Sequence, residues 1–84
     1  MSTEEIRAAV KKSIANITNI NLEDITDSAS YKDDLQLDSL TILEIAVDAE
    51  YQFQVTIPDE VLGEIRTVDD TVRIVQQHLE LAVA

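Results

Sequence analysis

Cysteine is absent from this chain of 84 residues, and glycine and proline occur once each, as Gly63 and Pro58. Without cysteine the chain forms no disulfide, no cysteine-ligated metal site and no catalytic thiol of its own. Strands joined by tight turns need several glycines or prolines, so the scarcity of both favours helices. No apolar run approaches the roughly 18 residues of a membrane span, and the N-terminal segment lacks a signal-peptide core. We therefore expect a cytoplasmic protein of one domain, residues 1–84, without membrane association.

Basic residues are also scarce, because 6 lysines and arginines accompany 17 aspartates and glutamates and give a formal net charge of −11. Apolar residues make up 45% of the chain, which distinguishes it from a disordered acidic tail. Residues 21–60 contain eleven acids and one lysine, so −10 of the charge lies there. This acidity disfavours nucleic acids and anionic lipids as partners and favours basic proteins. The charged segment is either a recognition surface or simply a solvated face.

The spacing of apolar residues predicts helices. Ser2 and Glu5 fit a capping box at the start of the first helix, and Pro58 suits the first turn of a short one. Thr67 reads as the cap of the last helix. The expected helices span residues 2–19, 38–53, 59–64 and 67 onward. The fold class is therefore predicted to be all-α, with three main helices and one short helix.

A long connection is expected between the first two main helices, from about Asn21 to Leu37. It is rich in Asp, Ser, Thr and Asn, which favour local turns over helix interiors. Four apolar residues are expected to pin it to the core, namely Leu22, Ile25, Tyr31 and Leu35. A loop of this length in a small domain is often functional.

The second helix has two apolar faces when its residues are placed at about 100° intervals. The expected core face consists of Ile42, Ile45, Ala46, Ala49 and Phe53. The opposite face carries Leu40, Val47 and Tyr51, interleaved with Glu44 and Asp48. Apolar residues rimmed by acids are typical of a binding surface, although the first loop or another helix covering this face is an equal alternative.

Nothing in the sequence favours catalysis by the chain itself. The single histidine, His78, lies off the apolar stripe of the last helix and is expected to be solvated. Asp33 and Asp34 lack the spacing of a calcium-binding EF-hand loop, and no glycine-rich phosphate loop is present. We predict that the protein is not an enzyme and has no metal site.

The segment from Asp33 to Leu40 leads from the long connection into the second helix. Asp38 can cap that helix, which places Ser39 in the first turn, exposed and close to unpaired backbone N–H groups. A phosphate ester on the Ser39 hydroxyl would lie at the positive end of the helix dipole. Taken alone, however, Asp-Ser-Leu is weak evidence, because most Asp-Ser pairs at such positions are ordinary helix caps.

The motifs "ITDSASYKDDLQLDSL", "FQVTIPDE" and "IRTVDD", with Glu44 between the first two, resemble the acyl carrier protein family in order and spacing. The resemblance covers nearly the whole chain. Because the chain begins with its own Met1, it is similar to freestanding carriers. It implies a four-helix bundle of acyl-carrier type with 4′-phosphopantetheine on Ser39. A phosphopantetheinyl transferase would install this group from coenzyme A with Mg²⁺, and its thiol would hold acyl groups as thioesters.

The resemblance and the charge together predict a monomer that docks onto acyl-transferring and condensing enzymes through basic patches on those enzymes. The predicted partner-binding residues are Asp38, Leu40, Glu44, Val47 and Asp48.

Two departures from the family pattern bear on the pathway. Gln36 stands where the family usually has a glycine, which would permit a positive φ. Thr41 and Ile42 follow Leu40 where fatty-acid carriers usually have an acid. These departures favour specialised or polyketide biosynthesis over fatty-acid biosynthesis. A peptidyl or D-alanyl carrier is the alternative within the class, and an acidic interaction module or inhibitor without a prosthetic group is the alternative outside it.

Overall fold

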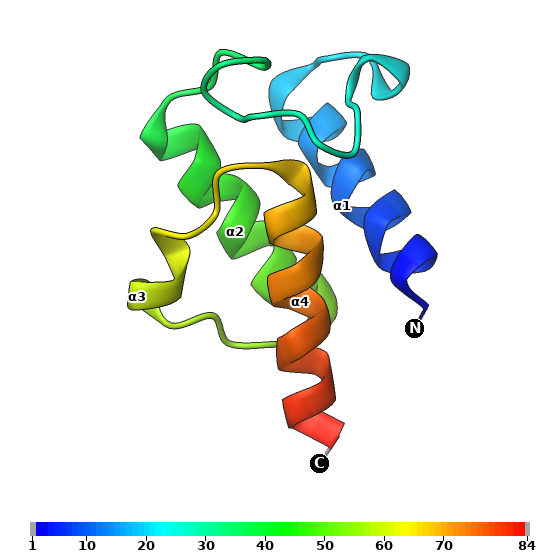
Figure 1. Ribbon diagram of the computed structural model, residues 1–84, viewed down its shortest axis with the longest axis vertical. Helices are drawn as coiled ribbons and strands as arrows, with labels where there is room; N and C mark the ends of the chain where they lie inside the picture. Colours follow the sequence, from blue (N-terminus) through cyan, green and yellow to red (C-terminus); the bar gives the residue numbers. More distant parts are fainter. Residues whose placement is uncertain (1, 84) are drawn as a thin grey trace.

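The computed structural model describes the backbone of residues 2–83 and the side chains of residues 2–80. Within that part the α-helices are α1 (Thr3–Thr18), α2 (Ser39–Phe53), α3 (Asp59–Leu62) and α4 (Val68–Val83), with one 3-10 turn, η1 (Leu22–Asp24). Figure 1 shows the three long helices beside one another, α3 at one flank, and the connection between α1 and α2 across one end. The predicted all-α fold class is confirmed.

Side-chain caps determine where α1 and α2 begin. The Ser2 hydroxyl accepts the Glu5 N–H at 3.2 Å, and the Glu5 carboxylate accepts the Ser2 N–H at 3.0 Å, so the predicted capping box is present. Asp38 Oδ1 accepts the Thr41 N–H at 2.8 Å, which confirms Asp38 as the cap of α2. Ser39 is therefore the first residue of α2.

The short helix α3 ends two residues earlier than the sequence predicts. Its last residue is Leu62, and Pro58 is its N-cap rather than a residue of its first turn. The N–H groups of Glu64 and Ile65 donate to carbonyls three residues back, so the α-helix ends in tighter turns of the 3-10 type. This change of direction brings Ile65, which is 5% exposed, into the core.

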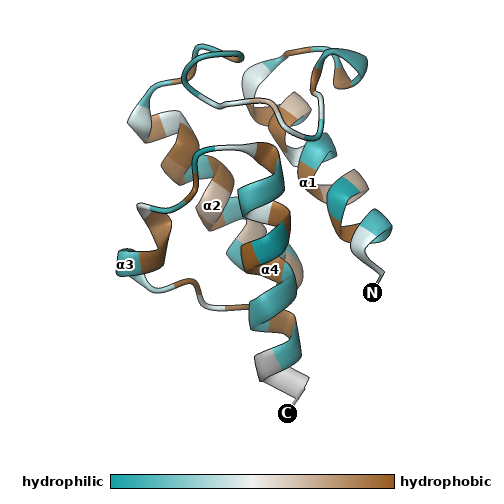
Figure 2. Ribbon diagram, viewed as in Figure 1, coloured by the Kyte–Doolittle hydropathy of each residue, from teal (hydrophilic) through white to brown (hydrophobic). Residues whose placement is uncertain are grey.

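The core lies between α1, α2 and α4, where Figure 2 shows hydrophobic residues along the facing sides of the helices. The predicted core face of α2 is confirmed except at Ile42, which is only partly buried. The buried apolar residues of the helices are Ile6, Val10, Ile14, Ile45, Ala46, Ala49, Phe53, Val68, Val72, Ile74 and Val75, and Thr71 is the buried polar one.

Three of the four apolar residues expected to pin the long connection do so: Ile25 and Tyr31 are buried, and Leu35 packs partly against the core. The prediction for Leu22 is wrong, because its side chain is 52% exposed. Leu22 opens η1, a turn on the surface that buries none of its residues. The core-facing positions beside the turn are taken by Ile25 and, in part, by Ile20.

Tyr31 joins the long connection to α4. Its hydroxyl lies 2.5 Å from Thr71 Oγ1, and neither side chain is exposed. Its backbone N–H donates to the Arg66 carbonyl at 2.9 Å, next to an antiparallel bridge between Ser30 and Thr67. Burial raises the pKa of the Tyr31 hydroxyl to about 12, against an opposing contribution from the hydrogen bond to Thr71.

The backbone at Gln36 adopts a left-handed conformation, with a φ of 55°. The family's glycine would reach this conformation freely, whereas a side chain raises its energy by roughly 1–2 kcal/mol. The turn is therefore retained despite the substitution, at the expense of local strain.

The raised pKa of Tyr31 predicts a loss of stability at alkaline pH. An unfolded tyrosine titrates near 10.0, so the contribution of the neutral hydroxyl is complete below pH 10 and is lost as the pH rises toward 12. We expect Tyr31→Phe to lower the free energy of unfolding by about 1–2 kcal/mol at pH 7 and to flatten this alkaline decline. Urea unfolding between pH 7 and 12 measures both effects.

The matched control is Tyr51→Phe, because Tyr51 is 87% exposed. It should keep the wild-type stability and pH profile. An unchanged alkaline decline in Tyr31→Phe would contradict the assignment.

The strain at Gln36 predicts that Gln36→Gly stabilises the fold. Glycine relieves the strain of a left-handed backbone that carries a side chain. Its greater freedom in the unfolded chain partly offsets this relief, so the free energy of unfolding rises by about 1 kcal/mol or less. Thermal unfolding followed by circular dichroism should show a rise of a few degrees. Gln77→Gly, at an exposed position within α4, should instead lose about 1 kcal/mol. Equal destabilisation by both changes would show that Gln36 is unstrained.

Candidate functional site

Ser39 presents an unengaged hydroxyl at the end of α2. Its side chain is exposed, and no described residue forms a hydrogen bond with its Oγ. The N–H groups of Ser39 and Leu40 precede the helix's own hydrogen-bond ladder, so the positive end of the helix dipole lies beside this hydroxyl. The geometry suits attachment of a phosphate ester at Ser39.

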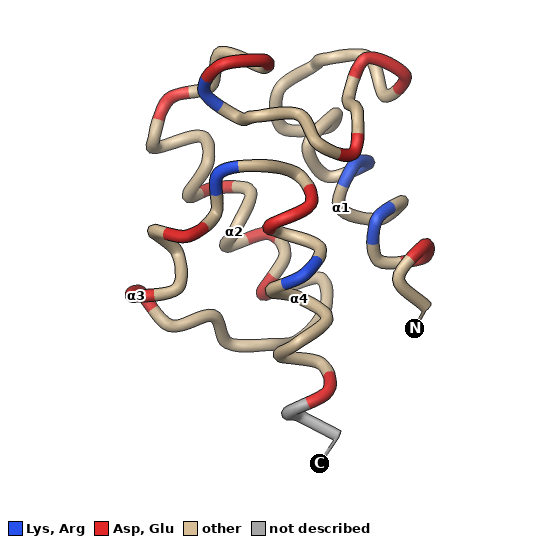
Figure 3. The backbone as a smooth tube through the Cα atoms, in the orientation of Figure 1, with Lys and Arg blue, Asp and Glu red and all other residues tan. Residues whose placement is uncertain are grey.

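Asp38 supplies the negative charge next to this serine. The Thr41 N–H bonded to its carboxylate lowers the pKa of Asp38, so the group is ionised at neutral pH. Figure 3 shows further acids along the connection and on α2. Glu44 is exposed and Asp48 is partly buried. The acids of residues 21–60 thus extend over the connection, the length of α2 and α3, and Asp38 is the one next to Ser39 in sequence.

A pocket of about 640 Å³ lies beside Ser39. Its wall combines the start of α2, the long connection and the segment between α3 and α4. The lining residues are Ser30, Lys32, Asp33, Ser39, Ile42, Leu43, Leu62, Gly63, Ile65 and Arg66. This volume is in the range of roughly 300–1,000 Å³ that small-molecule sites occupy, so a pantetheine-sized group fits beside Ser39. Sequence reasoning missed the pocket because its walls come from segments far apart in the chain.

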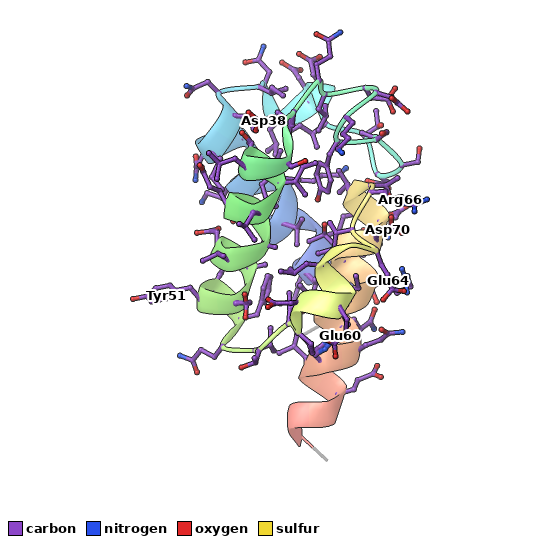
Figure 4. All side chains as sticks on the ribbon, turned by 90° about the vertical axis from the view of Figure 1, so that its left-hand side faces the viewer. Asp38, Tyr51, Glu60, Glu64, Arg66 and Asp70 are labelled. Carbon is purple, nitrogen blue, oxygen red and sulfur yellow. The ribbon has the colours of Figure 1, made fainter. Side chains whose placement is uncertain are left out.

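The face of α2 opposite the core is uncovered in the part of the chain that the structure describes. Its apolar side chains are exposed by 64% at Leu40, 44% at Leu43, 52% at Val47 and 87% at Tyr51. Figure 4 shows Tyr51 extending away from the bundle. We call Leu40, Leu43, Val47 and Tyr51 the outer face of α2. Val47 lies eight residues beyond Ser39, about 12 Å along the helix axis.

The remaining candidates do not form a site. His78 is partly buried rather than solvated as predicted, because its ring folds back along α4 and Nδ1 lies 2.8 Å from the Ile74 carbonyl. Among the described side chains, no group of three or more His, Asp or Glu residues is arranged to hold a metal ion. None of the described helices is long and apolar enough to span a membrane.

Comparison of the sequence with known proteins finds one matching family and several similar acyl carrier proteins. Residues 8–75 match the family described as "Phosphopantetheine attachment site". The chain is 43% identical over 77 residues to the meromycolate extension acyl carrier protein of Mycobacterium tuberculosis, covering 92% of this chain and 67% of that protein. It is 37% identical over 76 residues to an acyl carrier protein of Thermobifida fusca, covering 90% and 96%.

A solved structure shows the same fold. The apo doublet acyl carrier protein from prodigiosin biosynthesis superposes with a TM-score of 0.78 at 28% identity, covering 88% of this chain. The match spans 36% of that doublet chain. From the family match, the sequence relatives and this superposition, we conclude that the chain belongs to the acyl carrier protein family, whose members bear covalent 4′-phosphopantetheine and act as carriers, not catalysts.

Proposed function

We propose that Ser39 carries the phosphopantetheine arm and that the protein shuttles acyl groups between enzymes of fatty-acid biosynthesis or, as we favour, of specialised or polyketide biosynthesis. The observation that carries this proposal is the exposed, unpaired Ser39 hydroxyl at the first residue of α2, beside a pocket of about 640 Å³. Ser39 also lies within the matched family segment, residues 8–75.

The neighbouring residues hold Ser39 in a reactive position. Asp38 caps α2 and thereby keeps the serine at the helix end, where its Oγ is accessible to a phosphopantetheinyl transferase carrying coenzyme A. The Oγ gives up its proton and forms a bond to the phosphorus next to the pantetheine of coenzyme A, while the pyrophosphate bond breaks and adenosine 3′,5′-bisphosphate leaves. When bound, the arm supplies the thiol that the chain lacks, on which acyl groups are held as thioesters. Ser39 itself takes no part in later transfers of the cargo.

The relatives support a specialised acyl pathway. The names of two of them refer to meromycolate extension and to prodigiosin biosynthesis. Gln36 and the absence of an acid at Thr41 or Ile42 agree with partners that differ from those of fatty-acid carriers. The named relatives are acyl carriers, which favours acyl cargo over peptidyl or D-alanyl cargo. Family membership argues against an interaction module without a prosthetic group.

Partner enzymes are proposed to dock on the outer face of α2 and the acids beside it. Leu40 and Val47 offer apolar contacts, while Asp38, Glu44 and Asp48 face basic patches around an active-site entrance. Complementary charge accelerates association without requiring tight binding, which suits a carrier that must leave again. The proposed carrier is a monomer, so this face stays free for successive partners.

Loading of Ser39 tests the attachment site directly. After incubation with coenzyme A and a broad-specificity transferase, we expect intact mass spectrometry to show one added phosphopantetheine on the wild type. Ser39→Ala should abolish the increment while keeping the helical circular dichroism spectrum. Ser28→Ala, which changes an exposed serine of the connection, should load normally. Persistence of the increment in Ser39→Ala, or no loading by several transferases, would refute the site.

Charge reversal tests the docking surface. Glu44→Lys and Asp48→Lys should each lower kcat/KM for transferase loading about tenfold at low salt and reduce its salt dependence, because attraction to the basic partner is removed. Glu80→Lys makes the same charge change at an exposed site on α4 and should have little effect. Unchanged kinetics at Glu44 and Asp48, or an equal loss in Glu80→Lys, would show that docking occurs elsewhere.

A further inference from the structure

The unpaired basic residues of this acidic chain concentrate at the pocket beside Ser39. Of the six lysines and arginines, three lie within ion-pair distance of described carboxylates, namely Arg7, Lys11 and Arg73. Lys12, Lys32 and Arg66 form no ion pair with any carboxylate in residues 2–80. Two of these three, Lys32 and Arg66, line the pocket.

The charge of the pocket therefore has the opposite sign to its surroundings. Its ionised lining residues are Lys32, Arg66 and Asp33, which sum to +1. The segment containing residues 21–60 carries −10. A positive pocket in such a segment favours an anion over a neutral group.

Backbone hydrogen bonds hold the chain at Lys32 and the chain at Arg66 beside each other at the pocket. Lys32 follows the buried Tyr31, whose N–H donates to the Arg66 carbonyl at 2.9 Å. The Arg66 N–H donates to Asp70 Oδ2 at 3.0 Å, so the Arg66 backbone is fixed on both sides of its Cα. Figure 4 shows the Arg66 side chain extending into solvent beside Asp70. Both side chains are exposed and belong to residues that line the pocket, so their charged groups are free to reorient toward an anion bound there.

We propose that Lys32 and Arg66 form an anion-binding pair that holds a negatively charged group carried on the arm at Ser39. The group is either the phosphodiester at the Ser39 end of the arm or a carboxylate on the cargo, as in a malonyl-class thioester. A guanidinium pairs with either anion through two parallel hydrogen bonds, and the lysine adds a point charge. This inference rests on the proposed attachment at Ser39 and extends it to the chemistry of the cargo.

Nuclear magnetic resonance of three loaded forms tests the proposal. Holo protein and forms loaded from acetyl- and malonyl-coenzyme A are prepared for the wild type, Lys32→Gln, Arg66→Gln and Lys12→Gln. Lys12 is exposed and unpaired on α1 and does not line the pocket, so its variant controls for net charge. The measured quantities are the ³¹P chemical shift of the phosphodiester and the pKa of the ¹³C-labelled malonyl carboxylate.

Two results support the pair and identify its ligand. If the phosphodiester is held, its ³¹P shift differs from that of free phosphopantetheine in all three wild-type forms. The shift then returns toward the free value in Lys32→Gln and Arg66→Gln and at high salt. If the cargo carboxylate is held, its pKa lies about 0.5 to 1 below that of malonyl-pantetheine, and the same variants restore it. Lys12→Gln leaves either signal unchanged.

Two other results overturn it. Loaded protein whose ³¹P shift and carboxylate pKa both equal the free values would refute the pair while leaving the carrier function intact, as would equal effects from Lys12→Gln. Failure of every form to load, seen in the mass spectrum before any resonance is recorded, would refute the attachment site and this inference together.

Discussion

The buried hydrogen bonds of Tyr31 determine how the site is assembled. Its hydroxyl pairs with Thr71 of α4, its N–H with the Arg66 carbonyl, and its own carbonyl accepts the Leu37 N–H at 2.8 Å. The last of these bonds fixes the chain one residue before Asp38, so the long connection enters α2 in a defined direction. Tyr31 therefore positions three parts of the site with respect to α4. These are the Ser39 end of α2, the pocket wall formed by the long connection, and the wall formed by the segment between α3 and α4.

The charges divide into a set that forms ion pairs within the fold and a set that does not. Arg7 on α1 lies 3.7 Å from carboxylate oxygens of both Asp27 and Asp69, and Lys11 bonds the Asp27 carboxylate and lowers its pKa. These cations hold the connection and the start of α4 against α1 despite the net charge of −11. The acids beside Ser39 have no such partners within the described residues, as the proposed docking of basic proteins requires.

Local signals in the sequence predicted the elements well, because caps and apolar spacing act over a few residues. The capping box at Ser2, the cap at Asp38 and the core face of α2 are of this kind. The buried pair of Tyr31 and Thr71 was missed because it joins residues 40 apart in sequence. Leu22 was misplaced because hydrophobicity alone does not say which residue of a turn faces the core. The family's glycine indicated only that a positive φ is permitted at this position, and the structure shows that Gln36 adopts one.

The central claim is that the first residue of α2 bears the prosthetic arm in the protein as it functions. Fragmentation mass spectrometry of the protein purified from its native cells, without added coenzyme A or transferase, tests it most directly. The expected result is a phosphopantetheine group localised to Ser39 in the peptide that contains Asp38 and Leu40. Finding the group on another serine, or finding Ser39 unmodified in every cellular form of the protein, would contradict it.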